Sequence, residues 1–394
     1  MAQKLLVKFS EYNVWYSKIK LSNGGVHMKL GLFFQPVHPP ERSLYDATEW
    51  NLEIIKEGDK LGYEEAWIGE HFTLQWEPIP SPDLLIAQAI KETKNIKLAP
   101  GAHLLPFHHP VELAHRIAYL DHLAQGRLML GVGAGSVLTD FKLFGIDPTT
   151  GIQGEMFVEA LNIMLKLWKE DGPFEYKGKF WTVNQSEVSA GGLLGPHIKP
   201  FQKPHPPIGI TGLSKNSETL KKASQFGFLP LSFGYSKDTL VSHWKMIEEG
   251  AVISGKKANR EEWHIAKDVF VADTDEEAYE HALGGAIGRV YRELQIPLFK
   301  HQNILSKFKT DPNQSDDSVT PEYFVKEAGL VGSPDTVARK LDELYDHLGG
   351  FGTLLVTCYD YADNPEVWKK SLKLLAEEVV PRLKKNRKQY FPTT

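Results

Sequence analysis

Short apolar runs alternate with longer stretches of helical periodicity along most of the chain, and this alternation constrains the fold more than any other feature. Strands that alternate with helices pair in parallel, because each helix carries the chain back to the edge where the next strand starts. Eight such units predict an α/β fold, a (β/α)8 TIM barrel. The expected strands are residues 28–34, 66–68, 96–102, 127–132, 208–210, 228–233, 265–272 and 353–357. The expected helices include residues 46–61, 110–122, 153–170, 214–226, 237–252, 275–295, 334–347 and 365–386.

A doubly wound open sheet would show the same alternation of strands and helices. Its dinucleotide-binding fingerprint G-x-G-x-x-G is incomplete here, since residues 131–135 read Gly-Val-Gly-Ala-Gly. We therefore favour the closed barrel, which can use residues 28–394 as a single domain. Residues 1–27 carry four lysines against one acidic residue and lack the apolar core of a secretory signal. We expect them to be an N-terminal extension outside the core.

Residues 171–207 interrupt the regular pattern. This segment holds six prolines and is longer than an ordinary connection between a helix and a strand. We expect an irregular insertion before strand five. Long loops of this kind often have a functional role.

Charge and cysteine content exclude several classes of protein. The net charge of −5 argues against bulk electrostatic binding of nucleic acid, and no apolar run is long enough to span a membrane. Cys358 is the single cysteine, so an internal disulfide framework and a cysteine-rich metal site are both excluded. A lone thiol fits a reducing compartment, and we expect a cytoplasmic protein.

Candidate catalytic residues lie where the expected strands end, because barrel active sites form at the C-terminal ends of the strands. His71 follows strand two directly, next to Glu70. A histidine titrates near neutral pH and can move protons there. A histidine that only hydrogen-bonds loop backbone is an equally good interpretation from position alone.

Four histidines, His103, His108, His109 and His115, lie close together in the sequence. A metal site needs ligands that converge in a fixed geometry, and no H-E-x-x-H pattern occurs. We therefore expect no metal, and we expect His108 and His109 to cap the helix that opens at Pro110.

Two further segments at strand ends could contact a ligand. Ser214 and Ser217 stand where strand five passes into a helix, a position that suits either a phosphate or simple N-capping. The glycines of residues 131–136 allow a flat ligand or another backbone to approach closely. Aromatic residues near strand ends, among them Phe33 and Phe34, could wall an apolar pocket or simply belong to the core.

Taken in order, several segments resemble the bacterial luciferase-like flavin-dependent monooxygenases, and in particular the branch that oxidises limonene and alkanals. The resemblance extends from Met28 to about Leu383. Each segment is weakly diagnostic alone, but their order and spacing together are specific. The segments are residues 29–34, 61–71, 105–110, 120–135, 206–207 and 332–334.

The resemblance implies a two-component enzyme that is usually a homodimer. It implies that reduced FMN, supplied by a separate flavin reductase, acts with O2 on a small apolar organic substrate. His71 matches the catalytic histidine of the family. The positions expected to contact the cofactor are Phe34, Ala102, Gly133, Ala134, Ser214 and Ser217.

The chain departs from the luciferases themselves where Ala134 replaces an arginine. No arginine occurs between Arg127 and Arg260, so the resemblance implies either that Lys215 or backbone N–H groups hold the flavin phosphate or that the flavin binds weakly. Two alternatives stay open: a deazaflavin-dependent oxidoreductase that transfers hydride, and a non-catalytic flavin-binding subunit that stabilises an active partner.

Overall fold

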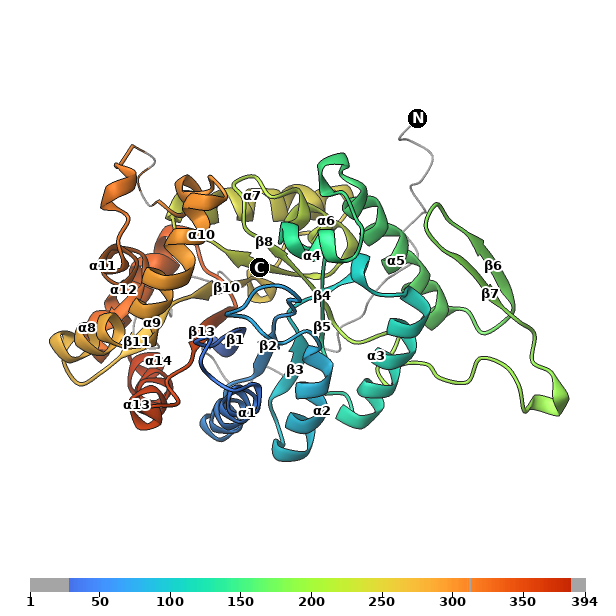
Figure 1. Cartoon of the computed structure of the whole chain (residues 1–394), viewed down its shortest axis with the longest axis horizontal. Helices are drawn as coiled ribbons and strands as arrows, with labels where there is room; N and C mark the ends of the chain where they lie inside the picture. Colours follow the sequence, from blue (N-terminus) through green and yellow to red (C-terminus); the bar gives the residue numbers. More distant parts are fainter. Residues whose placement is uncertain (1–27, 310, 312, 384–394) are drawn as a thin grey trace.

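The computed structural model describes residues 28–309, 311 and 313–383, so the extension expected at residues 1–27 lies outside the described residues. Helices surround a central sheet of parallel strands (Figure 1). The strands of this sheet are β1 (Lys29–Val37), β2 (Glu65–Ile68), β3 (Lys97–Pro100), β4 (His103–Leu104), β5 (Leu130–Gly133), β8 (Ile208–Gly212), β9 (Leu229–Phe233), β10 (His264–Lys267) and β13 (Thr353–Tyr359). Every one of them lies within or beside a strand expected from the sequence.

The sheet closes on itself through a strand that is divided in two. The strand order is β3-β2-β1-β13-β10-β9-β8-β5-β4, and β3 and β4 are consecutive segments of the chain. β3 pairs with β2, whereas β4 pairs with β5 through His103 and Val132. In addition, a parallel bridge between Leu98 of β3 and Leu128 joins β3 to the residues just before β5. The predicted barrel is therefore confirmed.

Amphipathic helices cover the outside of the barrel. Their starts carry the expected signals: Ser43 accepts a hydrogen bond from the Asp46 N–H, and α3 and α12 have proline in their first turn. None of the helices in the described part of the chain is long and apolar enough to cross a membrane. The covering helices are α1 (Leu44–Leu61), α2 (Pro82–Glu92), α3 (Pro110–Ala124), α5 (Ile152–Lys169), α6 (Glu218–Phe226), α7 (Lys237–Ile253), α12 (Pro334–Leu348) and α13 (Pro365–Leu374).

A single tryptophan fills much of the barrel interior. Trp67 of β2 is fully buried in a small interior cluster that also holds Phe33 and Leu355. A Cβ atom added to Gly209 would lie 2.7 Å from the Trp67 ring, and one added to Gly131 would lie 3.2 Å from it. These glycines leave the space that the indole occupies. The interior is a packed core rather than a channel.

The region after β10 departs from the sequence prediction. The strand expected at 265–272 divides, because β10 stays in the barrel while β11 (Val269–Val271) pairs with β12 (Leu330–Gly332) in a separate two-stranded sheet. The helix expected at 275–295 is also broken, since Gly285 takes an extended conformation (φ −94°, ψ −156°). The chain between β11 and β12 contains the helices α8 (Asp275–Gly284), α9 (Ala286–Val290), α10 (Ile296–His301) and α11 (Pro321–Tyr323).

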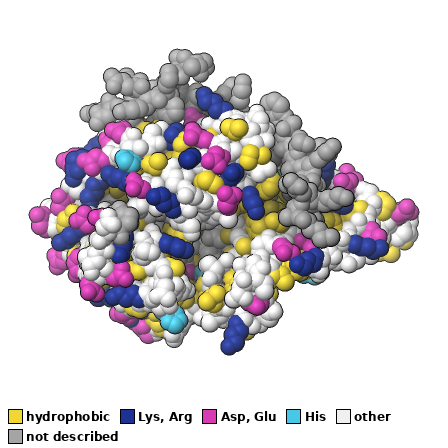
Figure 2. Space-filling view, turned by 90° about the horizontal axis from the view of Figure 1, so that it is seen from above, with side chains coloured by type: hydrophobic (Ala, Val, Ile, Leu, Met, Phe, Trp, Pro, Cys, Tyr) yellow, Lys and Arg dark blue, Asp and Glu magenta, His cyan; other side chains and the backbone are white. Residues whose placement is uncertain are grey.

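The insertion at 171–207 is more ordered than expected. It contains an antiparallel hairpin of β6 (Phe174–Lys177) and β7 (Thr182–Gln185), which projects from the body beyond α5 (Figure 1). Glu159 of α5 anchors the hairpin turn, because its carboxylate accepts backbone hydrogen bonds of 2.8–3.0 Å. Seen from above, the segment extends away from the barrel with apolar side chains on its surface (Figure 2), among them Leu193, which is 85% exposed.

Candidate active site

His71 lies three residues beyond the end of β2, at the C-terminal end of the barrel, and is held by a buried aspartate. Its Nδ1 is 3.2 Å from Oδ2 of Asp140, which comes from α4 (Leu138–Leu143). Asp140 also accepts hydrogen bonds from the Thr73 N–H at 2.8 Å and the Thr73 hydroxyl at 2.5 Å. Burial opposes ionisation of Asp140, but the hydrogen bonds from His71 and Thr73 outweigh it and lower its pKa. An ionised Asp140 fixes the His71 proton on Nδ1.

The other ring nitrogen of His71 faces a second carboxyl group. Nε2 of His71 is 3.3 Å from Oε2 of Glu77, which is only 7% exposed. Burial raises the pKa of Glu77 to about 7, and the nearby Asp140 charge adds to that shift while His71 opposes it. Burial lowers the pKa of His71, but Glu77 and Asp140 together outweigh burial and the net pKa is raised. The three groups form one electrostatically coupled unit, Asp140–His71–Glu77.

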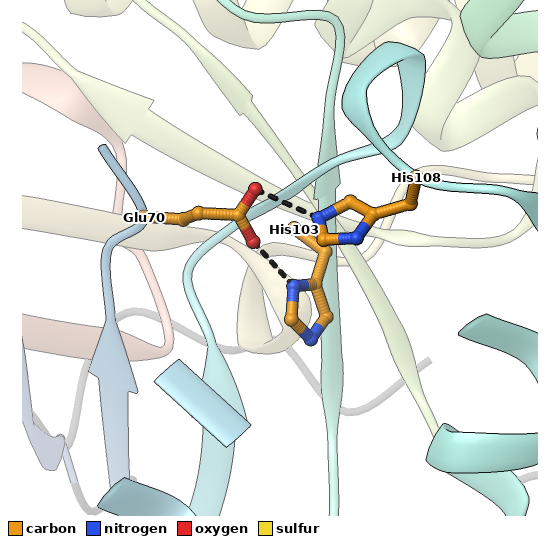
Figure 3. A group of neighbouring side chains, drawn as sticks. All are labelled: Glu70, His103 and His108. Atoms are coloured by element: carbon orange, nitrogen blue, oxygen red, sulfur yellow. Dashed lines mark hydrogen bonds and ion pairs between the residues drawn. The ribbon is translucent and has the colours of Figure 1, made fainter. Parts of the chain in front are cut away.

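Glu70, the residue before His71, points into a different cluster. Its carboxylate lies between two imidazoles, 2.5 Å from Nδ1 of His103 and 2.8 Å from Nε2 of His108 (Figure 3). Burial disfavours its charge, but the hydrogen bonds from His103 and His108 outweigh burial and lower its pKa to about 2. Nε2 of His103 points away from Glu70 and has no hydrogen-bond partner among the described residues, although His103 is fully buried.

The prediction that His108 and His109 cap α3 is wrong. His109 stands at the N-cap position, but its side chain makes no capping bond, and His108 reaches across to Glu70 instead. The ligand atoms of Glu70, His103 and His108 lie within 4.8 Å of one another, a spacing that could hold a metal ion. In the present arrangement the carboxylate satisfies one nitrogen of each imidazole. His115 stays separate, bonded to the Val111 carbonyl of its own helix at 2.7 Å.

The glycine-rich end of β5 lies beside the gap between β3 and β4. A Cβ atom added to Gly133 would lie 3.7 Å from Cβ of Ala102 and 3.3 Å from the Leu104 side chain. Ala102, Gly133 and Ala134 are all half-buried. Three neighbouring positions with no side chain beyond Cβ leave a surface that a flat ring could contact.

Phe34 does not face this surface. Its side chain is 1% exposed and packs in the large core between the sheet and the helices. Phe33 points to the other side of β1, into the barrel interior, and its ring lies 4.8 Å from that of Phe233. The alternation of side chains along a strand accounts for the difference, since neighbouring residues face opposite sides of the sheet.

The two serines after β8 have different surroundings. The helix expected from residue 214 begins only at Glu218, with Ser217 as its N-cap and the Leu220 N–H donating to the Ser217 hydroxyl at 3.4 Å. Ser217 is buried, whereas Ser214 and Lys215 are exposed in the preceding turn. The first N–H groups of a helix have no partner within the helix, so α6 opens with donors available to an anion.

Aromatic side chains gather beside His71. Phe107 stacks on Phe144 with ring centroids 4.6 Å apart, and Phe72 meets both rings edge to face. A Cβ atom added to Gly135 would lie 3.0 Å from the Phe141 ring, so the β5 end lies against the same group. These rings form an apolar wall on one side of the strand ends.

Sequence reasoning selected His71 as a candidate, but it did not find the two carboxyl groups that contact it. Asp140 lies 69 residues away on a short helix after β5, and Glu77 lies on the loop after β2. Two acidic residues in the loops that follow barrel strands were a usable signal, because such loops meet at one end of the barrel. The same signal applies to Glu70 and His103, which follow β2 and β3.

Comparisons with known proteins point to one family. The profile of the Luciferase-like monooxygenase family matches residues 28–350. The chain is 36% identical to 3,6-diketocamphane 1,6-monooxygenase of Pseudomonas putida over 372 residues, 90% of this chain and 98% of that protein. It is 29% identical to limonene 1,2-monooxygenase of Rhodococcus erythropolis, with 89% of this chain and 85% of that protein covered.

A solved structure agrees with these sequence matches. It is the oxygenating constituent of 3,6-diketocamphane monooxygenase from Pseudomonas putida, a type II Baeyer-Villiger monooxygenase in complex with FMN. The TM-score is 0.86 at 36% identity, with 91% of this chain and 99% of that chain covered. The barrel, its order of strands and the matched length together show that this chain belongs to the luciferase-like monooxygenase family.

Proposed function

We propose that this chain is the oxygenating component of a two-component, FMN-dependent monooxygenase that oxidises a small apolar organic substrate. The similarity to the FMN-bound oxygenating constituent over nearly the whole chain carries the proposal. A monooxygenase places one atom of O2 in the substrate and releases the other as water, which consumes two electrons and two protons. Reduced FMN supplies the electrons when bound, and the protein must control the protons.

The residues at the strand ends fit FMN. Ala102, Gly133 and Ala134 offer a half-buried surface without long side chains, which suits the flat ring system. The start of α6 offers backbone N–H groups and the Ser217 hydroxyl to the phosphate, with Ser214 in the preceding turn. Lys215 adds a positive charge next to that start, in a stretch without arginine. Phe33 replaces Phe34 in this proposal, because only Phe33 faces the barrel interior.

We assign proton control to His71. Asp140 keeps one proton on Nδ1, and the raised pKa of His71 favours a second proton on Nε2. An imidazole held in this way can give a proton to an oxygen atom near the end of β2 and take it back afterwards. The aromatic wall of Phe72, Phe107 and Phe144 would exclude water on one side and favour an apolar substrate.

The partners and location follow from the same proposal. A component that uses reduced FMN needs a flavin reductase as its partner. A homodimer and a cytoplasmic location remain predictions, and light scattering of the purified chain tests the first. Exposed apolar side chains on the insertion, such as Leu193 and Leu194, give a surface of the kind that a second copy covers.

The test is turnover with chemically reduced FMN, 18O2 and a panel of ketones, aldehydes and terpenes. We expect one labelled oxygen atom in the product, and a loss of about 10²–10⁴-fold in turnover for His71→Asn with FMN affinity retained. Ser217→Ala is the contrasting variant, because it should weaken FMN binding while turnover at saturating FMN persists.

Two results would overturn this proposal. Oxidation of an alcohol by a deazaflavin without O2 would identify a hydride-transferring oxidoreductase. FMN binding with no turnover on any substrate, together with stimulation of an active homologue, would identify a non-catalytic subunit.

A further inference from the structure

We propose that Glu77 is a positioning residue for His71: its carboxyl forms an ion pair with the Nε2 side of the imidazole and thereby sets when the proton on Nε2 is available for chemistry. The proposal rests on the proposed function, in which His71 controls protons. The sequence did not single out Glu77, and its role follows from geometry. Of the two carboxyl groups that contact His71, Glu77 alone faces Nε2.

The loop after β2 holds the Glu77 carboxyl in place. The Glu77 N–H donates to the Leu74 carbonyl at 2.9 Å, which closes a tight turn. The His71 N–H donates to the Ile79 carbonyl at 3.1 Å, so the backbone just beyond Glu77 returns to the residue whose side chain Glu77 contacts. The Glu77 side chain is 9% exposed. The Glu77 carboxyl is therefore held close to Nε2 of His71 and is largely shielded from solvent.

Three groups set the electrostatics of His71. Glu77, Asp140 and Glu70 each favour its charged form, whereas burial disfavours it. Glu77 in turn feels the charges of His71 and Asp140. Asp140 is satisfied by Thr73 and stays ionised, and Glu70 is satisfied by His103 and His108. Of these three carboxyl groups, Glu77 is therefore the one whose pKa lies near neutral pH.

The protonation of Glu77 has a direct consequence for His71. When Glu77 is ionised, its charge holds the protonated imidazole in an ion pair on the Nε2 side. When Glu77 carries its own proton, its attraction for Nε2–H falls, and that N–H can turn to another acceptor at the barrel mouth. Because the pKa of Glu77 is raised to about 7, both states are populated under neutral conditions.

The test is a pH titration of His71 by NMR in the full chain labelled with 15N-histidine, with His71→Asn used to assign the signal. In Glu77→Gln, the lost negative charge should lower the pKa of His71 by about 1–2 pH units. Glu64→Gln is the matched control, because Glu64 is an exposed carboxylate at the other end of β2. That control should leave the His71 titration unchanged.

Activity gives a second, independent measurement. In Glu77→Gln, ionisation at position 77 can no longer withhold the Nε2 proton, so the alkaline limb of the kcat profile should follow the lowered pKa of His71 alone, with KM and FMN affinity unchanged. Glu77→Asp should restore the native profile in part. An unchanged His71 titration in Glu77→Gln would overturn the proposal. If His71→Asn kept full turnover, the catalytic assignment of His71 would fail, whereas the NMR result would still decide whether Glu77 is coupled to it.

Discussion

Glu70 and Glu77 are two buried carboxyl groups seven residues apart, both next to histidines, and their pKa values move in opposite directions. The pKa of Glu70 falls to about 2, and the pKa of Glu77 rises to about 7. Their exposure is similar, at 2% and 7%. Burial therefore cannot account for the difference.

The number of hydrogen-bond donors accounts for it. Glu70 receives short hydrogen bonds from His103 and His108, one on each oxygen. Among the described residues, the Glu77 side chain has only the longer 3.3 Å contact with His71, and it lies near a second negative charge, Asp140. A buried carboxylate that is fully hydrogen-bonded stays ionised and acts as a structural element, whereas one with few donors retains a proton that it can exchange.

The largest effect should come from removing the well-bonded carboxylate. Glu70→Ala leaves His103 and His108 buried without their shared acceptor, and we expect a loss of about 3–5 kcal/mol in the free energy of unfolding. Chemical denaturation at neutral pH measures this loss. Glu77→Ala is the matched variant and should cost clearly less. If the two variants lost equal free energy of unfolding, Glu70 would contribute no more to stability than Glu77.

The pH dependence of stability should have opposite signs at the two carboxyl groups. Glu70 has a lowered pKa, so its contribution is present above the unfolded pKa of 4.5 and is lost as the pH falls towards about 2. Glu77 has a raised pKa, so its contribution is present below 4.5 and is lost as the pH rises through about 7. Each shift corresponds to about 3 kcal/mol at most.

Denaturation curves measured from about pH 3 to pH 8 can separate these two contributions. Glu70→Gln should flatten the acid side of the stability profile, and Glu77→Gln should flatten the neutral side and stabilise the protein at the alkaline end. A Glu77→Gln variant less stable than the native chain at about pH 8 would show that Glu77 is a structural carboxylate like Glu70.

The smallest effect should come from removing one donor of Asp140. Thr73→Val deletes the hydroxyl that lies 2.5 Å from Oδ1 of Asp140. We expect a loss of about 1 kcal/mol and a higher Asp140 pKa, because one of several donors is gone. Thr73→Ser keeps the hydroxyl and should behave like the native chain. No change in Thr73→Val would mean that the backbone donors alone suffice for Asp140.

Local periodicity was enough to predict the barrel, because each strand and its helix leave their own pattern in the sequence. The same reasoning could not find the pairing of β11 with β12, which joins segments about sixty residues apart into a second sheet. The helix expected at 275–295 fails at Gly285, where the backbone is extended and a Cβ atom would lie only 2.3 Å from the carbonyl oxygen of His281.

For the site, its position after a strand made His71 a candidate, but one of the two carboxyl groups that contact it comes from another segment at the same end of the barrel. Asp140 reaches His71 only because the β2 and β5 ends lie at the same end of the barrel, and sequence distance gives no measure of that separation. The Glu70 cluster was missed for the same reason. His108 stands at a sequence position typical of a helix cap, but its side chain contacts Glu70 instead, and this tertiary contact outweighs the local preference for capping.

The buried Trp67 side chain limits the routes by which small molecules can reach the C-terminal end of the barrel. Because the buried indole is packed against Gly131 and Gly209, no open channel runs along the axis of the barrel that the structure describes. In the proposed function, FMN and the organic substrate therefore approach from the end of the barrel where His71 and Asp140 lie, and the product leaves by the same end.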